Sequence, residues 1–123
     1  MNPVGMIEHV TELMRPMGTV RLKRMFGGHG IYIDELFVAI MASQQLYLKT
    51  DEQTFATFAQ AGCTPFVYDG HGKPATMKYW TVPDEALESA QAMRPWATLA
   101  MDAALRARVQ RATPKPRAQR RAP

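Results

Sequence analysis

Cysteine is almost absent from this sequence, and its scarcity limits where the protein works. The 123 residues include one cysteine, Cys63, so the chain cannot form an internal disulfide. No apolar run approaches the roughly 20 residues of a membrane-spanning helix. The first four residues have neither the basic region nor the apolar core of a secretory signal. We therefore expect a cytoplasmic protein with no membrane association, in a compartment that keeps thiols reduced.

The residues that would build a metal or catalytic site are equally sparse. The three histidines, His9, His29 and His71, are not spaced as metal ligands from one another or from Cys63. The carboxylates are scattered, and no pair of them is set into an apolar segment as acid–base catalysis requires. The sequence therefore predicts no enzyme, no metal and no cofactor. One alternative stays open, a small-ligand or enzymatic site near the two Gly-His-Gly turns and Cys63.

Phosphate-binding loops of the familiar kinds are also missing. Neither G-x-G-x-x-G nor G-x-x-x-x-G-K-[ST] occurs in the chain. Gly72 and Lys73 are followed by Pro74, so no hydroxyl and no helix start follow the lysine. A plain turn is the better interpretation of this segment.

Acidic residues are absent beyond Asp102, so the C-terminal end of the chain is positively charged and the rest is not. Seven basic residues lie from Arg106 onwards, whereas residues 1–105 hold eight basic residues and eleven acids, a net charge of −3. The overall charge of +4 therefore comes from the C-terminal end. Residues 112–123 are predicted to be a disordered basic tail after a domain spanning 1–111.

A basic tail of this composition is either a solvated segment that binds nothing or a contact for DNA or RNA. Binding would be directed at phosphate and would be largely independent of base sequence. The residues expected to make these contacts are Lys115, Arg117, Arg120 and Arg121.

Apolar residues recur at helical spacing in three segments. The first helix begins at Asn2–Pro3 and ends before Pro16. The second is expected over about 51–61, capped by Thr50 and stopped by Gly62.

The third helix is expected to begin at Pro83 and to be broken or restarted at Pro95. Trp96 would anchor its last part against the sheet, and the helix would end near Arg111. Several of the nine methionines fall on predicted helices, where they fill the core or provide an adaptable contact surface.

Six further segments have the apolar content or alternation of strands: 19–23, 31–33, 36–42, 46–48, 66–68 and 75–81. The first four are joined by turns too short for a crossover, so they must be antiparallel neighbours. The segment 36–42 does not alternate, which indicates a central strand covered on both faces, or one under helices and an oligomer contact. The predicted fold is α+β, a two-layer domain with an antiparallel sheet of about six strands and flanking helices in the order α-β4-α-β2-α.

Glycines interrupt this pattern where a strand should continue. Gly27, Gly28 and Gly30 fall within four residues and indicate a positive φ, a bulge or a close backbone approach. Gly70 and Gly72 mark the turn of a second hairpin.

Several short motifs occur in register between Leu13 and Leu105. They are Phe26–Tyr32, Leu46–Lys49, Pro65–Phe66, Gly72–Pro74, Met77–Tyr79 and Val82–Pro83. Together they resemble the N-terminal domain of the TfoX/Sxy family. That resemblance implies an α+β two-layer domain, supplies no catalytic residues, and points to regulation, because full-length members are linked to natural competence and act with the cyclic-AMP receptor protein.

Those members carry a second, helical domain, so this chain is expected to be a stand-alone single-domain member. The resulting hypothesis is a non-catalytic regulatory binding domain that works through a protein partner, such as the transcription machinery. A nucleic-acid accessory protein using the tail is the alternative, and a homodimer is a further possibility.

Overall fold

The computed structural model describes residues 3–25, 27–70 and 73–112. His71, Gly72 and the tail beyond Ala112 lie outside the described residues, so the predictions that fall on them stay predictions.

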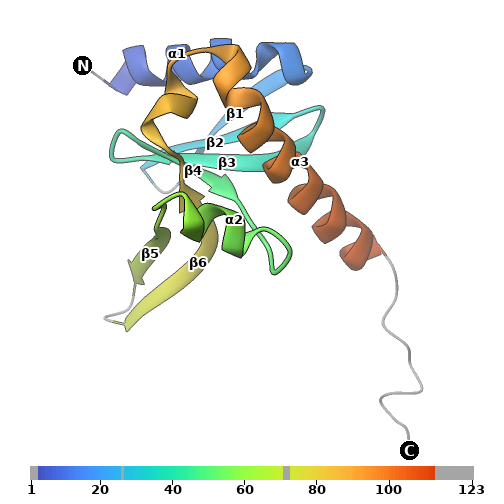
Figure 1. Ribbon diagram of the computed structural model, residues 1–123. Coiled ribbons are helices and arrows are strands. Elements are labelled where there is room, and N and C mark those ends of the chain that lie inside the picture. Colours follow the sequence, from blue (N-terminus) through green and yellow to red (C-terminus); the bar gives the residue numbers. More distant parts are fainter. Residues whose placement is uncertain (1–2, 26, 71–72, 113–123) are drawn as a thin grey trace, which may run out of the picture.

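The strands form one open antiparallel sheet in the order β1-β2-β3-β4-β6-β5 (Figure 1). Its strands are β1 Val20–Met25, β2 Gly28–Ile33, β3 Leu36–Ala42, β4 Gln45–Lys49, β5 Pro65–Gly70 and β6 Lys73–Thr81. The first four strands are antiparallel neighbours, and the β5–β6 hairpin joins them through the pairing of β4 with β6. The predicted α+β class and element order are confirmed.

Two-residue turns fix the register of β2, β3 and β4. Asp34 and Glu35 have φ of 51° and 67°, and Ser43 and Gln44 have φ of 51° and 64°. Positive φ at both central residues is the geometry whose twist matches that of the paired strands. Asp34 strengthens its turn by accepting a hydrogen bond from the Thr19 N–H at 2.9 Å.

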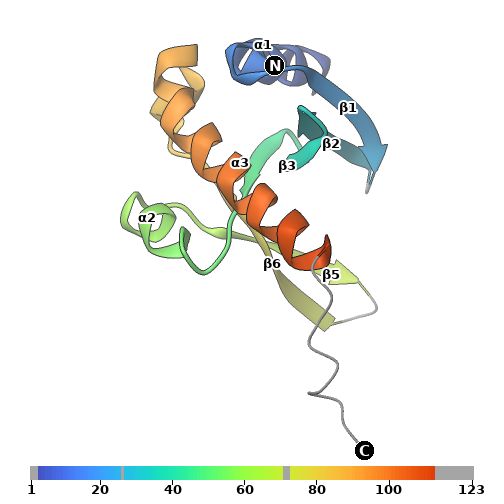
Figure 2. The same ribbon diagram turned by 90° about the vertical axis from the view of Figure 1, so that its right-hand side faces the viewer.

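The described helices are α1 Pro3–Met14, α2 Phe55–Gln60 and α3 Ala90–Ala112, with the short 3₁₀ helices η1 Arg15–Met17 and η2 Asp84–Leu87. In Figure 2, α2 and α3 lie on one side of the sheet. None of these helices combines the length and hydrophobicity needed to cross a lipid bilayer within the described residues.

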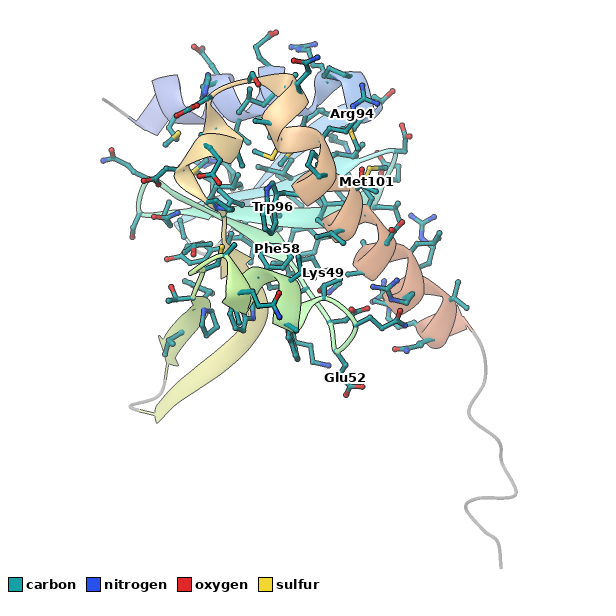
Figure 3. The ribbon with its side chains drawn as sticks, viewed as in Figure 1. Lys49, Glu52, Phe58, Arg94, Trp96 and Met101 are labelled. Carbon is teal, nitrogen blue, oxygen red and sulfur yellow. The ribbon has the colours of Figure 1, made fainter. Side chains whose placement is uncertain are left out.

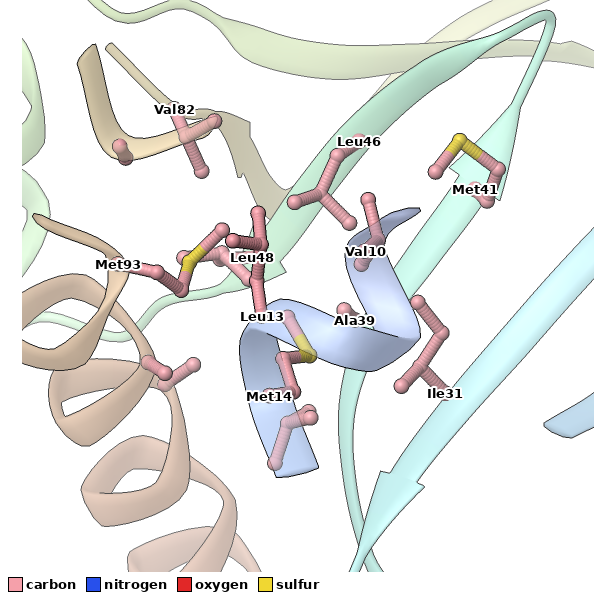
Figure 4. Packing of buried hydrophobic residues seen from close by; sticks show 14 of the residues in the cluster. Val10, Leu13, Met14, Ile31, Ala39, Met41, Leu46, Leu48, Val82 and Met93 are labelled. Atoms are coloured by element: carbon pink, nitrogen blue, oxygen red, sulfur yellow. The ribbon is translucent and has the colours of Figure 1, made fainter. Parts of the chain in front are cut away.

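The core lies between the helices and one face of the sheet (Figure 4). Val10 and Met14 of α1 and Met93 of α3 pack there against Ile31 and Leu48. The middle of β3 is buried on both faces, as the lack of alternation in its sequence predicted.

The second helix begins later than predicted, and Thr50 does not cap it. The Thr50 N–H donates to the carbonyl oxygen of Lys78 at 2.9 Å, so this residue prolongs the pairing of β4 with β6. Asp51 opens the turn instead, and its N–H donates to the hydroxyl of Thr54 at 3.0 Å. Gly62 stops the helix as expected, with a φ of 85°.

The predicted break at Pro95 is also wrong, because α3 runs through this residue. The helix starts after Ser89, whose hydroxyl accepts a hydrogen bond from the Ala92 N–H at 3.0 Å, as an N-cap does. Pro95 lies near this end and removes one intrahelical hydrogen bond, the one to the Gln91 carbonyl. The break expected there lies earlier, between η2 and α3.

Of the three features expected at Gly27, Gly28 and Gly30, a positive φ and a close backbone approach are present, and the bulge lies outside these glycines. β1 and β2 pair without a register shift, and the irregularity occurs between β2 and β3, at Ile31 and Tyr32. Gly27 forms the β1–β2 turn with a φ of 74°. Gly28 and Gly30 lie inside β2.

Candidate functional site

One face of the sheet lies opposite the core that the helices cover, and we call it the helix-free face, although the C-terminal end of α3 reaches its edge through Arg108 and Arg111. Side chains alternate along a strand, so the neighbours of a core residue point away from the helices. Ile31 and Leu48 belong to the core. Tyr32 and Lys49, which follow them, therefore point to the helix-free face.

A row of cationic and aromatic side chains crosses this face. The cation–aromatic row consists of Arg21, Tyr32, Phe37, Lys49 and Tyr79. Strand pairing places Arg21 opposite Tyr32, Tyr32 opposite Phe37, and Lys49 opposite Tyr79. The row therefore contains residues of five of the six strands.

The members of the row are in contact with one another. The Arg21 guanidinium carbon lies 4.2 Å from the centre of the Tyr32 ring, and the Lys49 Nζ lies 5.0 Å from that of Tyr79. The Tyr32 and Phe37 rings are stacked with centroids 5.0 Å apart, and Phe37 lies 5.7 Å from Tyr79. Rings and cations at these separations attract each other, so the side chains of the row stabilise one another.

Two cavities that share Lys49 lie between this row and the C-terminal half of α3; together we call them the cationic cleft. The first has a volume of about 320 Å³ and is lined by Tyr32, Phe37, Lys49 and Tyr79 of the sheet and by Arg108 and Arg111 of α3. The second has a volume of about 210 Å³ and is lined by Lys49, Thr50, Asp51, Lys78, Arg106 and Gln110. The Arg108 guanidinium closes one end by donating to the Glu35 carbonyl oxygen at 2.8 Å.

Positive charge is concentrated in this cleft. Burial lowers the pKa of Lys49, and the cations Arg111 and Lys78 lower it further, while Asp51 opposes them. Across the described residues, no ion pair involves Lys49, Lys78, Arg108 or Arg111. An anion in the cleft would relieve this mutual repulsion.

Two of the carboxylates that line the cleft, Asp51 and Glu35, are held by arginines. Arg106 donates to both carboxylate oxygens of Asp51, at 2.6 and 2.9 Å, and lowers the pKa of that carboxyl. Arg21 binds Glu35 in the same two-pronged way, and its hydrogen bonds lower the pKa of Glu35. Glu52 lies exposed at the rim (Figure 3).

Thr50 lines the smaller cavity and is fully buried. Its hydroxyl oxygen has no hydrogen-bond partner within the described part of the chain. A buried hydroxyl is normally paired, and one without a partner is the kind of group that a bound ligand or water satisfies.

Tyr79 is buried within the row, and the pKa of its hydroxyl is raised to about 12. Burial is the main cause, the nearby Tyr32 adds to it, and Arg111 opposes both. The ring therefore stays neutral at physiological pH and contributes an uncharged aromatic surface to the cleft.

The alternative site near the Gly-His-Gly turns gains no support from the described residues. His29 lines a small cavity at the β1–β2 turn, whereas Cys63 lines a separate one beside Thr81. Burial raises the pKa of the Cys63 thiol, which makes it less reactive. His9 lies apart, bonded to the Leu87 carbonyl oxygen at 2.6 Å. No group of three metal-ligating side chains occurs among the residues that the structure describes.

The glycines predicted to shape the turns have different surroundings. A Cβ on Gly28 would collide with the backbone carbonyl oxygen of Met41, so β2 and β3 approach closely there. A Cβ on Gly30 would meet the side chains of Met25 and Phe37, so Phe37 of the row packs over this glycine. Gly70 ends β5.

Sequence reasoning missed the cleft, although it recognised the charge that leads to it. Arg108 and Arg111 were counted with the basic C-terminal end, and the structure places them on α3 against the sheet. The strand alternation of Tyr32, Lys49 and Tyr79 was visible in the sequence. Only the pairing of β4 with β6 brings these residues together.

The fold is that of a small two-layer α+β domain. A family model described as the TfoX N-terminal domain matches residues 12–104. Because the match covers most of the chain, the protein belongs to that family, and the resemblance drawn from its motifs is confirmed. No curated protein sequence matches the chain.

Proposed function

We propose that this protein is a non-catalytic regulatory domain that binds nucleic acid through its cationic cleft and the basic segment after α3. The observation that carries the proposal is the cluster of Lys49, Lys78, Arg108 and Arg111 around one cleft. Residues 1–105 are net negative, and the cluster combines two of their cations, Lys49 and Lys78, with two cations from the end of α3.

Phosphate is the anion that fits such a cluster. Arginine and lysine bind phosphate oxygens through charge-assisted hydrogen bonds, and these contacts carry no sequence information by themselves. The segment that follows α3 holds Lys115, Arg117, Arg120 and Arg121. Arg111 lines the cleft and lies in the last turn of α3, so the chain leaves the helix next to the cleft. The family supports the regulatory part of the proposal, because its full-length members are linked to the regulation of natural competence.

The salt dependence of binding tests the proposal. The double variant Lys78→Gln/Arg111→Gln removes two phosphate contacts and should flatten the log–log salt slope on duplex DNA by about 1.8, at about 0.9 per contact. Arg94→Gln is the matched control, because Arg94 is an exposed residue near the other end of α3 (Figure 3). Equal slopes for all three proteins would remove the cleft from nucleic-acid binding.

The predicted tail is tested by ending the chain after Ala112. This truncation removes four basic residues and should flatten the slope by as much as about 3.6 if each contacts one phosphate. An unchanged slope would show that the tail touches no phosphate.

Contact with a second copy of the chain is a second candidate function, favoured by the outer face of α3. Leu105 and Val109 lie four residues apart on this helix and are 48% and 54% exposed. Sedimentation equilibrium of the wild type and of Leu105→Glu/Val109→Glu tests it. A dimer lost in the variant would support the contact, and a monomeric wild type would exclude it.

A further inference from the structure

We propose that the larger cavity of the cationic cleft binds the terminal phosphate of a nucleic-acid strand, which is a phosphate monoester. This inference rests on the proposed function and names the part of the nucleic acid that the cleft prefers. The cavity is lined by the cations Lys49, Arg108 and Arg111, which come from the end of β4 and the last turns of α3. The smaller cavity holds the next phosphate of the strand, beside Lys78.

The charges that line the larger cavity match a dianion. Among the described residues they are the three cations and one carboxylate, that of Glu35. Arg21 already binds this carboxylate, donating to its two oxygens at 2.8 and 2.9 Å. A phosphate monoester carries a charge of about −1.5 to −2 at pH 7, whereas an internal phosphate of a strand carries about −1. The cavity therefore favours the monoester.

The cations of the larger cavity have hydrogen-bond donors to spare. Within the described part of the chain, Lys49 and Arg111 take part in no ion pair. Arg108 uses one donor on the Glu35 carbonyl oxygen, and a guanidinium has several more. The oxygens of a phosphate monoester accept charge-assisted hydrogen bonds from several such donors at once. Lys49 is also half-buried, where opposite charges attract each other more strongly than in bulk water.

The shape of the larger cavity admits the end of a strand better than its middle. Phe37 and Tyr79 form its wall on the sheet, and Ala104 lies on the side of α3. The hydrogen bond from Arg108 to the Glu35 carbonyl oxygen, at 2.8 Å, closes one end. An internal phosphate carries a nucleotide on each side and needs an opening at both ends. A terminal phosphate carries a nucleotide on one side, so a single opening is enough.

The smaller cavity has less net positive charge and suits an internal phosphate. The charged residues in its lining are Lys49, Lys78, Arg106, Asp51 and Glu52. Arg106 is engaged by Asp51, so Lys49 and Lys78 are the cations that can bind a phosphate there. Lys49 lines both cavities and therefore lies between the two phosphates. The hydroxyl of Thr50, without a partner in the described structure, adds a polar group to this wall.

Fluorescence anisotropy of two hairpin duplexes tests the inference on the full chain. The hairpins have the same sequence, a short 5′ overhang and a fluorophore in the loop. They differ only at the 5′ end, which is a phosphate in one and a hydroxyl in the other. We expect the 5′-phosphate to tighten binding to the wild type roughly tenfold or more, the effect of one hydrogen bond to a charged group.

Variants of the two cavities locate this preference. Lys49→Gln/Arg111→Gln removes two cations of the larger cavity and should largely abolish the difference between the hairpins. Arg111→Gln alone, in the exposed last turn of α3, should reduce the difference and keeps the test valid if the double variant does not fold. Lys78→Gln is the matched control, because Lys78 lines the smaller cavity and not the larger one. It should weaken both hairpins alike and leave their difference unchanged.

The inference would be overturned by equal affinity of the wild type for the two hairpins, or by a difference that Lys78→Gln reduces as much as the double variant does. If the hairpins bind equally and the salt slope still depends on Lys78 and Arg111, the proposed function stands and this inference fails. If neither hairpin binds, both fail.

Glycerol phosphate tests the other source of the same chemistry, a free phosphate monoester. It should displace the 5′-phosphate hairpin only weakly, because it has no second phosphate to place beside Lys78. Binding of glycerol phosphate as tight as that of the hairpin would identify a small phosphate monoester as the ligand, and would overturn the assignment to a strand end.

Discussion

Alanine substitution of the glycines in the β1–β2 hairpin should give unequal losses of stability. Gly27 has a φ of 74° and open space around its Cβ position, so Gly27→Ala meets only the backbone penalty of about 1–2 kcal/mol. Gly28 faces the backbone carbonyl oxygen of Met41, which cannot rotate away. Gly28→Ala must therefore separate β2 from β3. Its loss of stability should lie at the upper end of the roughly 1–3 kcal/mol that overpacking costs, or above it.

The stability loss of Gly30→Ala should lie between those of Gly27→Ala and Gly28→Ala, or below both. The atoms that its Cβ would meet are the end of the flexible Met25 side chain and the edge of the Phe37 ring. Met25 can rotate away, because its side chain has three rotatable bonds. This variant should also disturb the cation–aromatic row, to which Phe37 belongs.

Urea unfolding of the three variants measures these differences as free energies. Gly62→Ala is the matched control for Gly27, because Gly62 has a φ of 85° and equally open surroundings. Gly27→Asn should lose less stability than Gly27→Ala, since asparagine tolerates the left-handed conformation better. If Gly28→Ala lost no more than Gly27→Ala, the close approach of β2 and β3 would be refuted.

Three other predictions concern one ion pair and the buried side chains. The pKa of Asp51 lies below its ordinary 3.8. Its contribution to stability should therefore be complete above the unfolded-state pKa and be lost as pH falls through the folded-state pKa. In urea melts, Asp51→Asn should remove this acid dependence and Arg106→Gln should reduce it. Phe58→Ala should lower the free energy of unfolding by about 3–5 kcal/mol because Phe58 is fully buried, and Trp96→Ala by less because Trp96 is only partly buried. A double-mutant cycle should show coupling between the two rings, whose centroids are 5.0 Å apart (Figure 3), and additive losses would contradict the contact. Cys63 should react slowly with a thiol reagent in the native state and rapidly in urea, since burial raises its pKa, and equal rates would place it in solvent.

The fold was predictable because its signals are local. Short turns force the first four strands to be antiparallel neighbours, and a positive-φ glycine after a helical segment marks its end. The errors at Thr50 and Pro95 have a common cause, which is that tertiary contacts overrule a local motif. Thr50 has the spacing of a helix cap, but its N–H is used by β6. Pro95 is tolerated within a helix that the core holds in place through Met93 and Ala97.

The cleft was less predictable because it depends on which strands become neighbours. Lys49 and Tyr79 are thirty positions apart in the chain, and only the insertion of β6 beside β4 places them opposite each other. The register of that pairing is set by burial of Trp80 beside Leu48 on the core side, since a slip of one residue in β6 would turn Trp80 away from the core. The same register aims Lys49 and Tyr79 at the helix-free face. The core therefore determines the position of the site, so a substitution that shifts the β4–β6 register should abolish the proposed nucleic-acid binding even with every cleft residue retained.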